Sequence, residues 1–333
     1  MFSLFKKSKE RKPDIARQDE FGYLGKTELR PDFIKYQVNS RESIALDHWV
    51  KEGFSYASRQ SATTGTDNSN FGLTNLFFMA GNDSETSLLG MITPSLDSSG
   101  RHYPFASFVN IGQELYRVHP SALFLNESND FIHLSERANA IFMAQSELEM
   151  QQEAQKLTQM AHVFKSSTSI NQLLEKFRNV PMSDLWQATG IDDEQTKATL
   201  IQESALLMQS IANRGCLRTQ VGLRFPMPKL SEGFELIAAF WLHLVTVIVA
   251  DHNWRPWVFY QTGSCGQPAS LTVFTTPVPP SFFDAIWSSK CGHQTVIDFA
   301  TVSPSEPLQQ EFLSLAKADN VSMYDALRRW CKA

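Results

Sequence analysis

The sequence predicts an α/β protein of the α+β type, in which helices flank an antiparallel or mixed β-sheet. Two observations predict this fold. Short apolar segments separated by glycine, asparagine and proline recur between residues 21 and 111 and again between 257 and 275, as in strands joined by turns. A long middle segment, at about residues 134–215, is instead rich in Ala, Gln, Glu, Leu and Met, which favour helices. The chain has 333 residues, 42% of them hydrophobic, so it can bury a sizeable core.

The N-terminal part is expected to begin with a strand, a helix and a loop. Residues 22–26, Gly-Tyr-Leu-Gly-Lys, have the pattern of a short strand with turn glycines. Apolar residues spaced through residues 31–49 favour a helix. Residues 58–70 are rich in Ser, Thr, Gly and Asn, which indicates a loop.

Three more strands are expected after this loop. Residues 73–80 and 87–93 are apolar and are separated by Gly81 and Asn82, so they predict a hairpin that ends in a turn at Pro94. Residues 102–111 have another strand-like pattern.

The middle segment should form three or four helices. Breaks are expected near residues 166–169, at Pro181 and near residues 190–192, because these positions carry helix-breaking or capping residues. Gly215 has the position of a helix C-cap. Core packing accounts for the Met and Leu stripes of this segment.

The C-terminal part begins with the most apolar run of the chain, Leu236–Ala250. This run is shorter than the ~20 residues that span a bilayer and contains His243, so we expect a buried helix with a core histidine. Two strands at residues 257–260 and 270–275 should follow. The remaining helices are expected at Ser281, as the cap of a short helix that ends at Trp287, and within residues 307–333.

Charge and cysteine content exclude several classes of protein. The formal net charge is −5, so we expect no nucleic-acid partner. None of the four cysteines forms a C-x-x-C pair, which favours reduced thiols and a cytoplasmic location over a zinc site or a disulfide framework. The basic start of the chain has no apolar stretch of secretory length after it. We therefore expect residues 1–20 to form a flexible basic tail, without stable membrane insertion.

No known catalytic motif is present in the sequence. Gly25-Lys26-Thr27 is similar to the end of a phosphate-binding loop, but Glu20 occupies the position of the required first glycine. The dinucleotide-binding G-x-G-x-x-G, the zinc-binding H-E-x-x-H and the G-x-S-x-G nucleophile motif are missing. We therefore predict no catalytic residue, no metal site and no cofactor, and we expect that the protein is not an enzyme.

Two segments, residues 22–34 and 94–105, are unusual for a plain scaffold because prolines, glycines and charges are concentrated in them. Asp97 can accept N–H bonds within its own turn. Arg101 can pair with a carboxylate through two nitrogens, and Asp32 or Asp97 is an available partner. The segments form either a rigid loop clamped by an ion pair or a fixed surface that presents Arg101 and Lys26 to a partner.

These segments resemble the signatures of the TagF family, also called ImpM, of type VI secretion-associated proteins. The first signature, Gly-aromatic-aromatic-Gly-Lys-Leu-Pro followed by Gly-Asp-Phe, is matched by Gly22, Gly25, Lys26, Asp32 and Phe33. The second, Pro-Ser-Val-Asp-x-x-Gly-Arg-aromatic-Pro, is matched by Pro94, Ser95, Asp97, Gly100, Arg101 and Pro104, with His102 as an additional position. Trp49, between the two, also fits. The departures are Leu24 for an aromatic residue, Thr27-Glu28 for Leu-Pro and Pro31 for glycine.

The resemblance implies a regulatory function. TagF proteins are post-translational repressors of the type VI secretion system, a contractile injection machine of Gram-negative bacteria. It implies that the chain binds and sequesters a component such as the forkhead-associated protein Fha. The alternatives are an accessory scaffold subunit of the apparatus, or a hydrolase with an unrecognised site around Asp32, Asp97 and Arg101.

The resemblance also implies a domain plan. A TagF-like α/β domain, with an architecture similar to longin or profilin, would span residues 21–300 and include the helical segment at about 134–215. Residues 301–333 would then form a C-terminal helical tail. The family's fused phosphatase domain needs an Asp-Gly-x-Gly turn, which this sequence does not contain.

Overall fold

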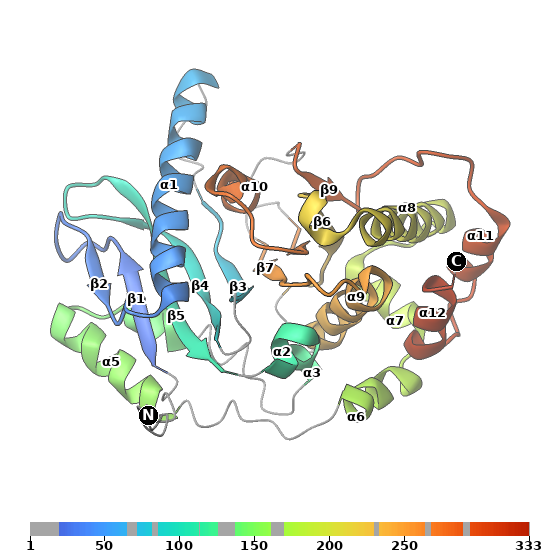
Figure 1. Cartoon of the computed structure of the whole chain (residues 1–333), viewed down its shortest axis with the longest axis horizontal. Helices are drawn as coiled ribbons and strands as arrows, with labels where there is room; N and C mark the ends of the chain where they lie inside the picture. Colours follow the sequence, from blue (N-terminus) through green and yellow to red (C-terminus); the bar gives the residue numbers. More distant parts are fainter. Residues whose placement is uncertain are drawn as a thin grey trace, which may run out of the picture.

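The computed structural model describes residues 20–64, 72–81, 86–112, 114–125, 137–160, 170–229, 233–263, 268–288 and 294–332. The strands in these ranges are β1 (Phe21–Gly25), β2 (Ile34–Tyr36), β3 (Asn75–Ala80), β4 (Ser87–Leu96), β5 (His102–Ile111), β6 (Gly222–Pro226), β7 (Trp257–Gln261), β8 (Ser270–Phe274) and β9 (Val296–Asp298). They form one open, nine-stranded sheet in the order β2-β1-β5-β4-β3-β7-β8-β6-β9 (Figure 1). Only β6 and β9 pair in parallel, so the predicted mixed sheet is confirmed.

Helices lie on both faces of this sheet. The α-helices are α1 (Arg41–Thr64), α2 (Glu114–Val118), α3 (Ala122–Leu125), α5 (Glu147–Met160), α6 (Ile170–Glu175), α7 (Met182–Thr189), α8 (Glu194–Arg214), α9 (Phe234–Val249), α10 (Phe283–Trp287), α11 (Gln310–Ala316) and α12 (Met323–Trp330). Short 3₁₀ turns are found at η3 (Lys176–Asn179), η4 (Cys216–Arg218) and η5 (Pro280–Phe282). Helices α5 to α8 confirm the helical middle segment. The break expected near residues 166–169 lies outside the described residues.

One face of the sheet is covered by α1 and α10 (Figure 1). Trp49 of α1 packs its indole ring against the rings of Trp257, Phe259 and Phe283, at centroid distances of 5.4, 5.8 and 5.1 Å. A β-carbon at Gly53 of α1 would lie 2.4 Å from the Phe283 β-carbon, so a glycine is needed where the two helices approach each other. This aromatic layer forms one of two core clusters.

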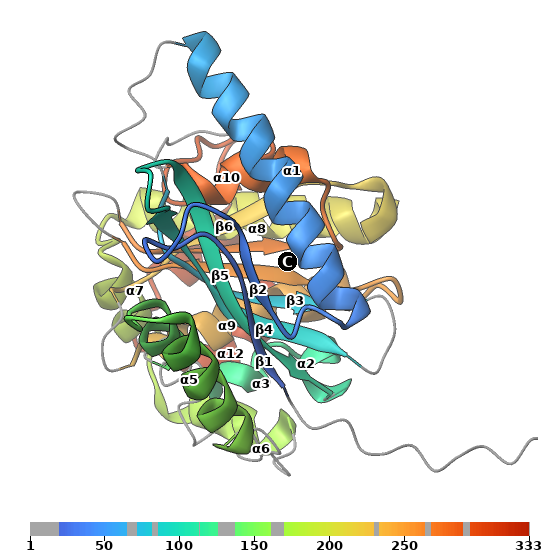
Figure 2. The ribbon, with the colours of Figure 1, turned by 90° about the vertical axis from the view of Figure 1, so that its left-hand side faces the viewer.

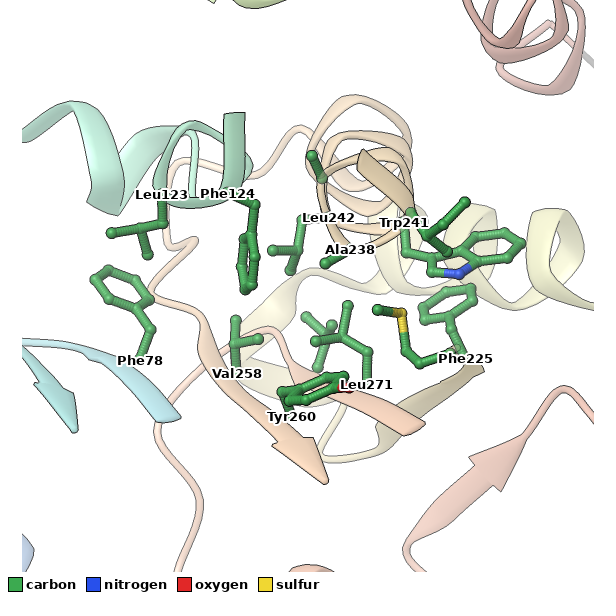
Figure 3. Close-up of a cluster of buried hydrophobic side chains, with 14 of the residues drawn as sticks. Phe78, Leu123, Phe124, Phe225, Ala238, Trp241, Leu242, Val258, Tyr260 and Leu271 are labelled. Carbon is green, nitrogen blue, oxygen red and sulfur yellow. The ribbon is translucent and has the colours of Figure 1, made fainter. Parts of the chain in front are cut away.

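The opposite face is covered by α3, α8, α9 and α5. Figure 3 shows how side chains from the sheet meet side chains of helices α9 and α3. The labelled residues of the sheet are Phe78, Phe225, Val258, Tyr260 and Leu271, and those of the helices are Leu123, Phe124, Ala238, Trp241 and Leu242. The indole nitrogen of Trp241 donates a hydrogen bond to the Pro226 carbonyl, 3.1 Å away, and so satisfies its only polar atom.

Helix α9 confirms the predicted buried helix. Its Phe240 and Trp241 also contact Trp330 of α12, whose indole donates to the Ile201 carbonyl of α8 at 3.1 Å. Among the helices that the structure describes, none has the length and hydropathy of a bilayer-spanning segment. His243 is buried, as expected for a core histidine, but its Nδ1 has no hydrogen-bond partner in the described residues.

Several element predictions are correct. The hairpin of β3 and β4, the strand β5 and the strands β7 and β8 occur where they were expected. Gly215 ends α8 with φ +85°, and its N–H donates to the Ile211 carbonyl at 2.7 Å, so it is a C-cap. The C-terminal residues form the helix pair α11 and α12.

The helix predicted over residues 31–49 is wrong in its first half. Residues 34–36 instead form β2, which pairs antiparallel with Tyr23–Gly25 of β1. Pairing satisfies the outer backbone groups of β1, which a helix at this place would leave open. Helix α1 begins only at Arg41, where the side chain of Ser40 accepts the Ser43 N–H at 3.1 Å.

Three boundary predictions are also wrong. The loop predicted from residue 58 begins later, because α1 continues to Thr64 (Figure 2). Ala57 is fully buried, whereas Arg59 and Gln60 beyond it are exposed, so the helix continues past its packed part. Strand β4 does not turn at Pro94 but continues to Leu96, since Pro94 lies opposite Pro104 and neither residue has an N–H to leave unpaired. Ser281 does not cap a helix, because it lies within η5. Strands β6 and β9 and helices α2 and α3 were not foreseen.

Candidate functional site

The two motif segments, residues 22–34 and 94–105, meet where the tip of the β4–β5 hairpin contacts the chain that follows β1. Asp97, directly after β4, has a fully buried side chain at the centre of this contact. Its Oδ2 accepts hydrogen bonds from Lys26 Nζ and from Arg101 Nε, both at 2.7 Å. We call these three residues the motif cluster. One carboxylate is therefore shared by two cations that come from two different segments.

Asp97 also organises its own turn, as predicted. Its Oδ1 accepts the backbone N–H groups of Ser99 and Arg101, at 2.9 and 3.0 Å. Burial alone would raise the pKa of Asp97, but the hydrogen bonds from Lys26, from the two backbone amides and from the Arg101 side chain outweigh burial and hold the pKa well below its usual range. The carboxyl group is therefore a stable anion and a poor proton acceptor.

The two cations of the motif cluster also hold the segment that follows β1. Arg101 Nη2 donates to the Pro31 carbonyl at 2.8 Å, and Lys26 Nζ donates to the same oxygen at 3.3 Å. The guanidinium of Arg101 thus contacts Asp97 through one nitrogen only, and the predicted pairing of a carboxylate with two guanidinium nitrogens is wrong. Asp97 is its partner. The side chain of Asp32 is exposed and forms no ion pair with another described residue.

Two glycines of β1 permit close approaches of neighbouring segments. Gly25 has φ +127°, and a β-carbon there would lie 2.3 Å from the Pro104 carbonyl oxygen. A β-carbon at Gly22 would lie 2.7 Å from both the Phe108 ring and the Tyr36 carbonyl oxygen. Gly100, at φ +78°, has no atom within 4 Å of its would-be β-carbon, so it serves the turn conformation alone.

One aromatic ring lies close to the Lys26 ammonium. It lies 4.9 Å from the centre of the Phe33 ring, whose edge packs on Tyr103 at 4.8 Å. Phe33 nevertheless remains 47% exposed, and the Arg101 side chain is 61% exposed. The motif cluster thus has a buried anion, Asp97, and an exposed guanidinium, Arg101, with the exposed ring of Phe33 beside it.

The other predicted residues lie at different depths. Ser95 is buried in β4, while Pro94 is half-buried and pairs with buried Pro104. Trp49 lies apart from the cluster, in the core under α1. The structure therefore brings together Lys26, Phe33, Asp97 and Arg101, with Gly25, Gly100 and Pro104 shaping the backbone around them.

A groove of about 460 Å³ lies beside the cluster. Its lining residues come from three places in the sequence: Thr27, Glu28 and Leu29; Pro94, Ser95, Leu96 and His102; and Phe142, Met143, Ala144 and Gln145. We call it the hairpin groove. Residues 142–145 were not predicted as site residues, because nothing in their local sequence indicates that they lie next to the hairpin.

Other reactive side chains are less accessible. Burial raises the pKa of the Cys216 thiol to about 11, and of the Cys331 thiol to about 11, so neither is a ready nucleophile. Cys265 and Cys291 lie outside the described residues. Within the described ranges, no three His, Cys, Asp or Glu side chains are grouped so that they could hold a metal ion.

A known protein family matches the part of the chain that carries both motif segments. Residues 22–162 match the family model described as the TagF N-terminal domain, type VI secretion system-associated. No curated protein matches the chain. Among solved structures, the crystal structure of PA0076 from Pseudomonas aeruginosa PAO1 is similar, with 13% identity and a TM-score of 0.45, over 86% of this chain and 100% of that chain.

Proposed function

Because residues 22–162 match the TagF N-terminal domain, described as type VI secretion system-associated, we propose that the chain represses type VI secretion after translation by binding one component of the system. The component we propose is the forkhead-associated protein Fha. Sequestration of this kind requires a stoichiometric complex and no turnover. The domain match is the observation that carries the proposal.

The geometry of the motif cluster supports a binding function. Every polar group of Asp97 is used to fix the tip of the hairpin, so the loop is held in one conformation before any partner arrives. A surface that is ordered in advance loses less conformational entropy on binding. Phe33 and Arg101 belong to the residue types that are enriched at interfaces, and both are exposed here.

The same cluster is poorly suited to acid–base catalysis. A general base works best with a pKa near the working pH, whereas the pKa of Asp97 is held far below it. Lys26 is 6% exposed and its ammonium is committed to Asp97 and to the Pro31 carbonyl. We therefore propose that the chain is not an enzyme and that a screen with phosphatase and esterase substrates will detect no turnover.

The test is a pull-down from the host cytoplasm with the tagged full-length chain, followed by quantitative mass spectrometry. The proposal expects Fha in near-equal amount. Capture of sheath or baseplate components in place of Fha would overturn sequestration and favour a scaffold subunit. Capture of no secretion component would overturn both.

Two variants distinguish a loss of contact with Fha from a loss of folding. Arg101→Ala removes one donor to the buried Asp97 carboxylate and one to the Pro31 carbonyl, so its Tm should fall below the wild-type value; assayed where it is still fully folded, it should also retain less Fha. Arg214→Ala, which is also exposed but lies at the end of α8, is the matched control and should retain Fha fully. Equal capture by the two variants would exclude Arg101 from the interface.

A further inference from the structure

The hairpin groove has the composition of a peptide-binding site. We propose that it binds an extended segment of a partner protein in which a bulky apolar side chain lies next to a lysine or arginine. This inference rests on the proposed function in one respect only, namely the identity of the protein that supplies the segment. The groove itself is defined by described residues and can be tested without that protein.

The apolar part of the groove is open to solvent. Met143 is 61% exposed, and Leu29, Leu96 and Phe142 line the groove as half-buried neighbours. A concave surface with a largely apolar lining is typical of a binding site. Methionine suits such a place because its flexible thioether adapts to side chains of different shape. A bound apolar side chain would remove Met143 from water.

The first wall of the groove is a hairpin tip that extends beyond its neighbours. Strand β3 pairs with β4 only as far as Ile92, and β1 pairs with β5 only as far as Phe105. Residues 94–96 and 102–104 therefore pair only with each other. The motif cluster compensates for the missing neighbours, because Lys26 and Arg101 hold Asp97 at the tip. The motif cluster therefore stabilises this wall of the groove.

The second wall is held by polar contacts at the start of α5. Gln145 Nε2 donates to the Met143 carbonyl at 2.9 Å, and the Gln145 N–H donates to Glu149 Oε2 at 2.8 Å. Arg30 joins this wall to the segment after β1 through an ion pair with Glu147 at 2.8 Å. Both walls are thus fixed without a ligand, which favours recognition of a segment in an extended conformation.

The free charge at the groove is negative. Glu28 lines it and is exposed, and the carboxylate has no ion-pair or hydrogen-bond partner in the described residues. The nearby cations are already engaged, Lys26 and Arg101 by Asp97, and Arg30 by Glu147. Charge complementarity therefore selects a basic residue in the bound segment.

One buried polar atom at the groove is unsatisfied. Thr27, which is 3% exposed, lines the groove, and its hydroxyl has no hydrogen-bond partner among the described residues. Buried hydroxyls are nearly always hydrogen-bonded in proteins. An unsatisfied buried hydroxyl of this kind costs free energy in the unbound chain.

Fluorescence anisotropy with labelled octapeptides tests the proposal on the full-length chain. The probes place Leu, Met, Phe or Trp next to Lys in one series and next to Glu in the other. The proposal expects binding by the Lys series, and at least ~10-fold weaker binding by the Glu series, about the effect of one well-placed charge pair. Failure of both series to bind, or equal binding by both, would overturn it.

Variants assign the binding to the groove. Met143→Asp should weaken the best Lys peptide at least ~10-fold, and Glu28→Lys should reverse the preference between the two series. The matched controls are Leu148→Asp, at a side chain that is 66% exposed but does not line the groove, and Glu311→Lys in α11. Met143 and Glu28 are exposed, so the variants should melt as their controls do.

Each result decides one proposal. A Met143→Asp variant that binds like Leu148→Asp would place the peptide elsewhere and overturn the groove. Groove binding without capture of any secretion component in the pull-down would instead leave the groove standing and overturn the proposed function. Capture of Fha by the wild type with no peptide binding would support the proposed function and overturn the groove as a peptide-binding site.

Discussion

Lys26 Nζ lies 2.7 Å from Asp97 Oδ2, and these residues are 71 positions apart in the sequence. The Asp97 side chain is fully buried and the Lys26 side chain is 8% exposed, so the ion pair is shielded from solvent. A pair of this kind is costly to break, because removal of one partner leaves the other charge buried without compensation. It connects the segment after β1 to the tip of the β4–β5 hairpin.

Asp97→Asn should therefore destabilise the protein clearly, by removing the counter-charge of Lys26 and weakening the bonds that close the turn. Thermal unfolding measures the effect as a drop in Tm. Asp32→Asn is the matched control, because Asp32 is an exposed acid of the same motif without an ion pair among the described residues, and its Tm should stay at the wild-type value. Equal Tm values for the two variants would show that the buried pair contributes nothing to stability.

The stabilisation by Asp97 should also depend on pH. The folded state holds the pKa of this carboxyl below its usual range, so the unfolded chain takes up the proton first as the pH falls. The contribution is complete well above the unfolded pKa of ~3.9 and is lost as the pH falls below that value. The difference in unfolding free energy between wild type and Asp97→Asn should thus be constant from pH 8 to pH 6 and shrink below pH 4. A constant difference down to pH 2.5 would contradict the ionic origin.

Gly25 and Gly100 both have a positive φ, but only Gly25 lies close to another segment of the backbone. Gly25→Ala would place a β-carbon 2.3 Å from the Pro104 carbonyl oxygen, whereas Gly100→Ala would meet no atom within 4 Å. The Gly100 variant should lose ~1–2 kcal/mol for the left-handed conformation alone. The Gly25 variant has the same kind of conformational cost plus a clash with backbone, so it should lose more than Gly100→Ala. Urea unfolding of the two variants side by side tests this order, and a Gly25 variant as stable as Gly100→Ala would contradict the close approach.

The sequence predicts those parts of the site whose contacts are local. Asp97, its turn and Arg101 lie within one short segment, so the pairing can be inferred from residue types. The contact of Lys26 with Asp97 depends on the placement of β5 between β1 and β4, which no local pattern specifies. The roles of Glu28 and Met143 are even harder to predict from the sequence, because the groove forms only where three separate segments meet.

One of the wrong element boundaries has a similar physical cause. Residues 34–36 lie in a stretch with helical spacing, but the open edge of β1 pairs with them, and hydrogen bonding in the sheet overrides the weak local preference. At the other end of α1, Val50 and Ala57 are buried against the sheet, and the helix continues beyond this packed part to Thr64 through residues that favour turns. Pairing in the sheet therefore explains the first of these two errors.

His243 provides a pH-dependent prediction away from the motif cluster. Burial, and to a smaller extent the neighbouring His119, lowers the pKa of His243 to about 4, and the ring centres of the two residues lie 6.5 Å apart. The unfolded chain has an ordinary histidine pKa of ~6.5, so it binds this proton more readily than the folded protein does. Stability should therefore fall as the pH decreases from 6.5 towards 4, by on the order of 3 kcal/mol from this residue.

His243→Leu should remove most of this slope, because leucine fills a similar volume in α9 and does not titrate. The unpaired Nδ1 of His243 means that few polar contacts are lost at pH 7.5, so the variant should be about as stable as the wild type there. His252→Gln is the matched control, since the His252 side chain is 91% exposed, and it should keep the wild-type slope. Chemical unfolding at pH 7.5, 6, 5 and 4.5 measures all three proteins. A His243→Leu variant that loses stability with acid as steeply as the wild type would assign the slope to other groups.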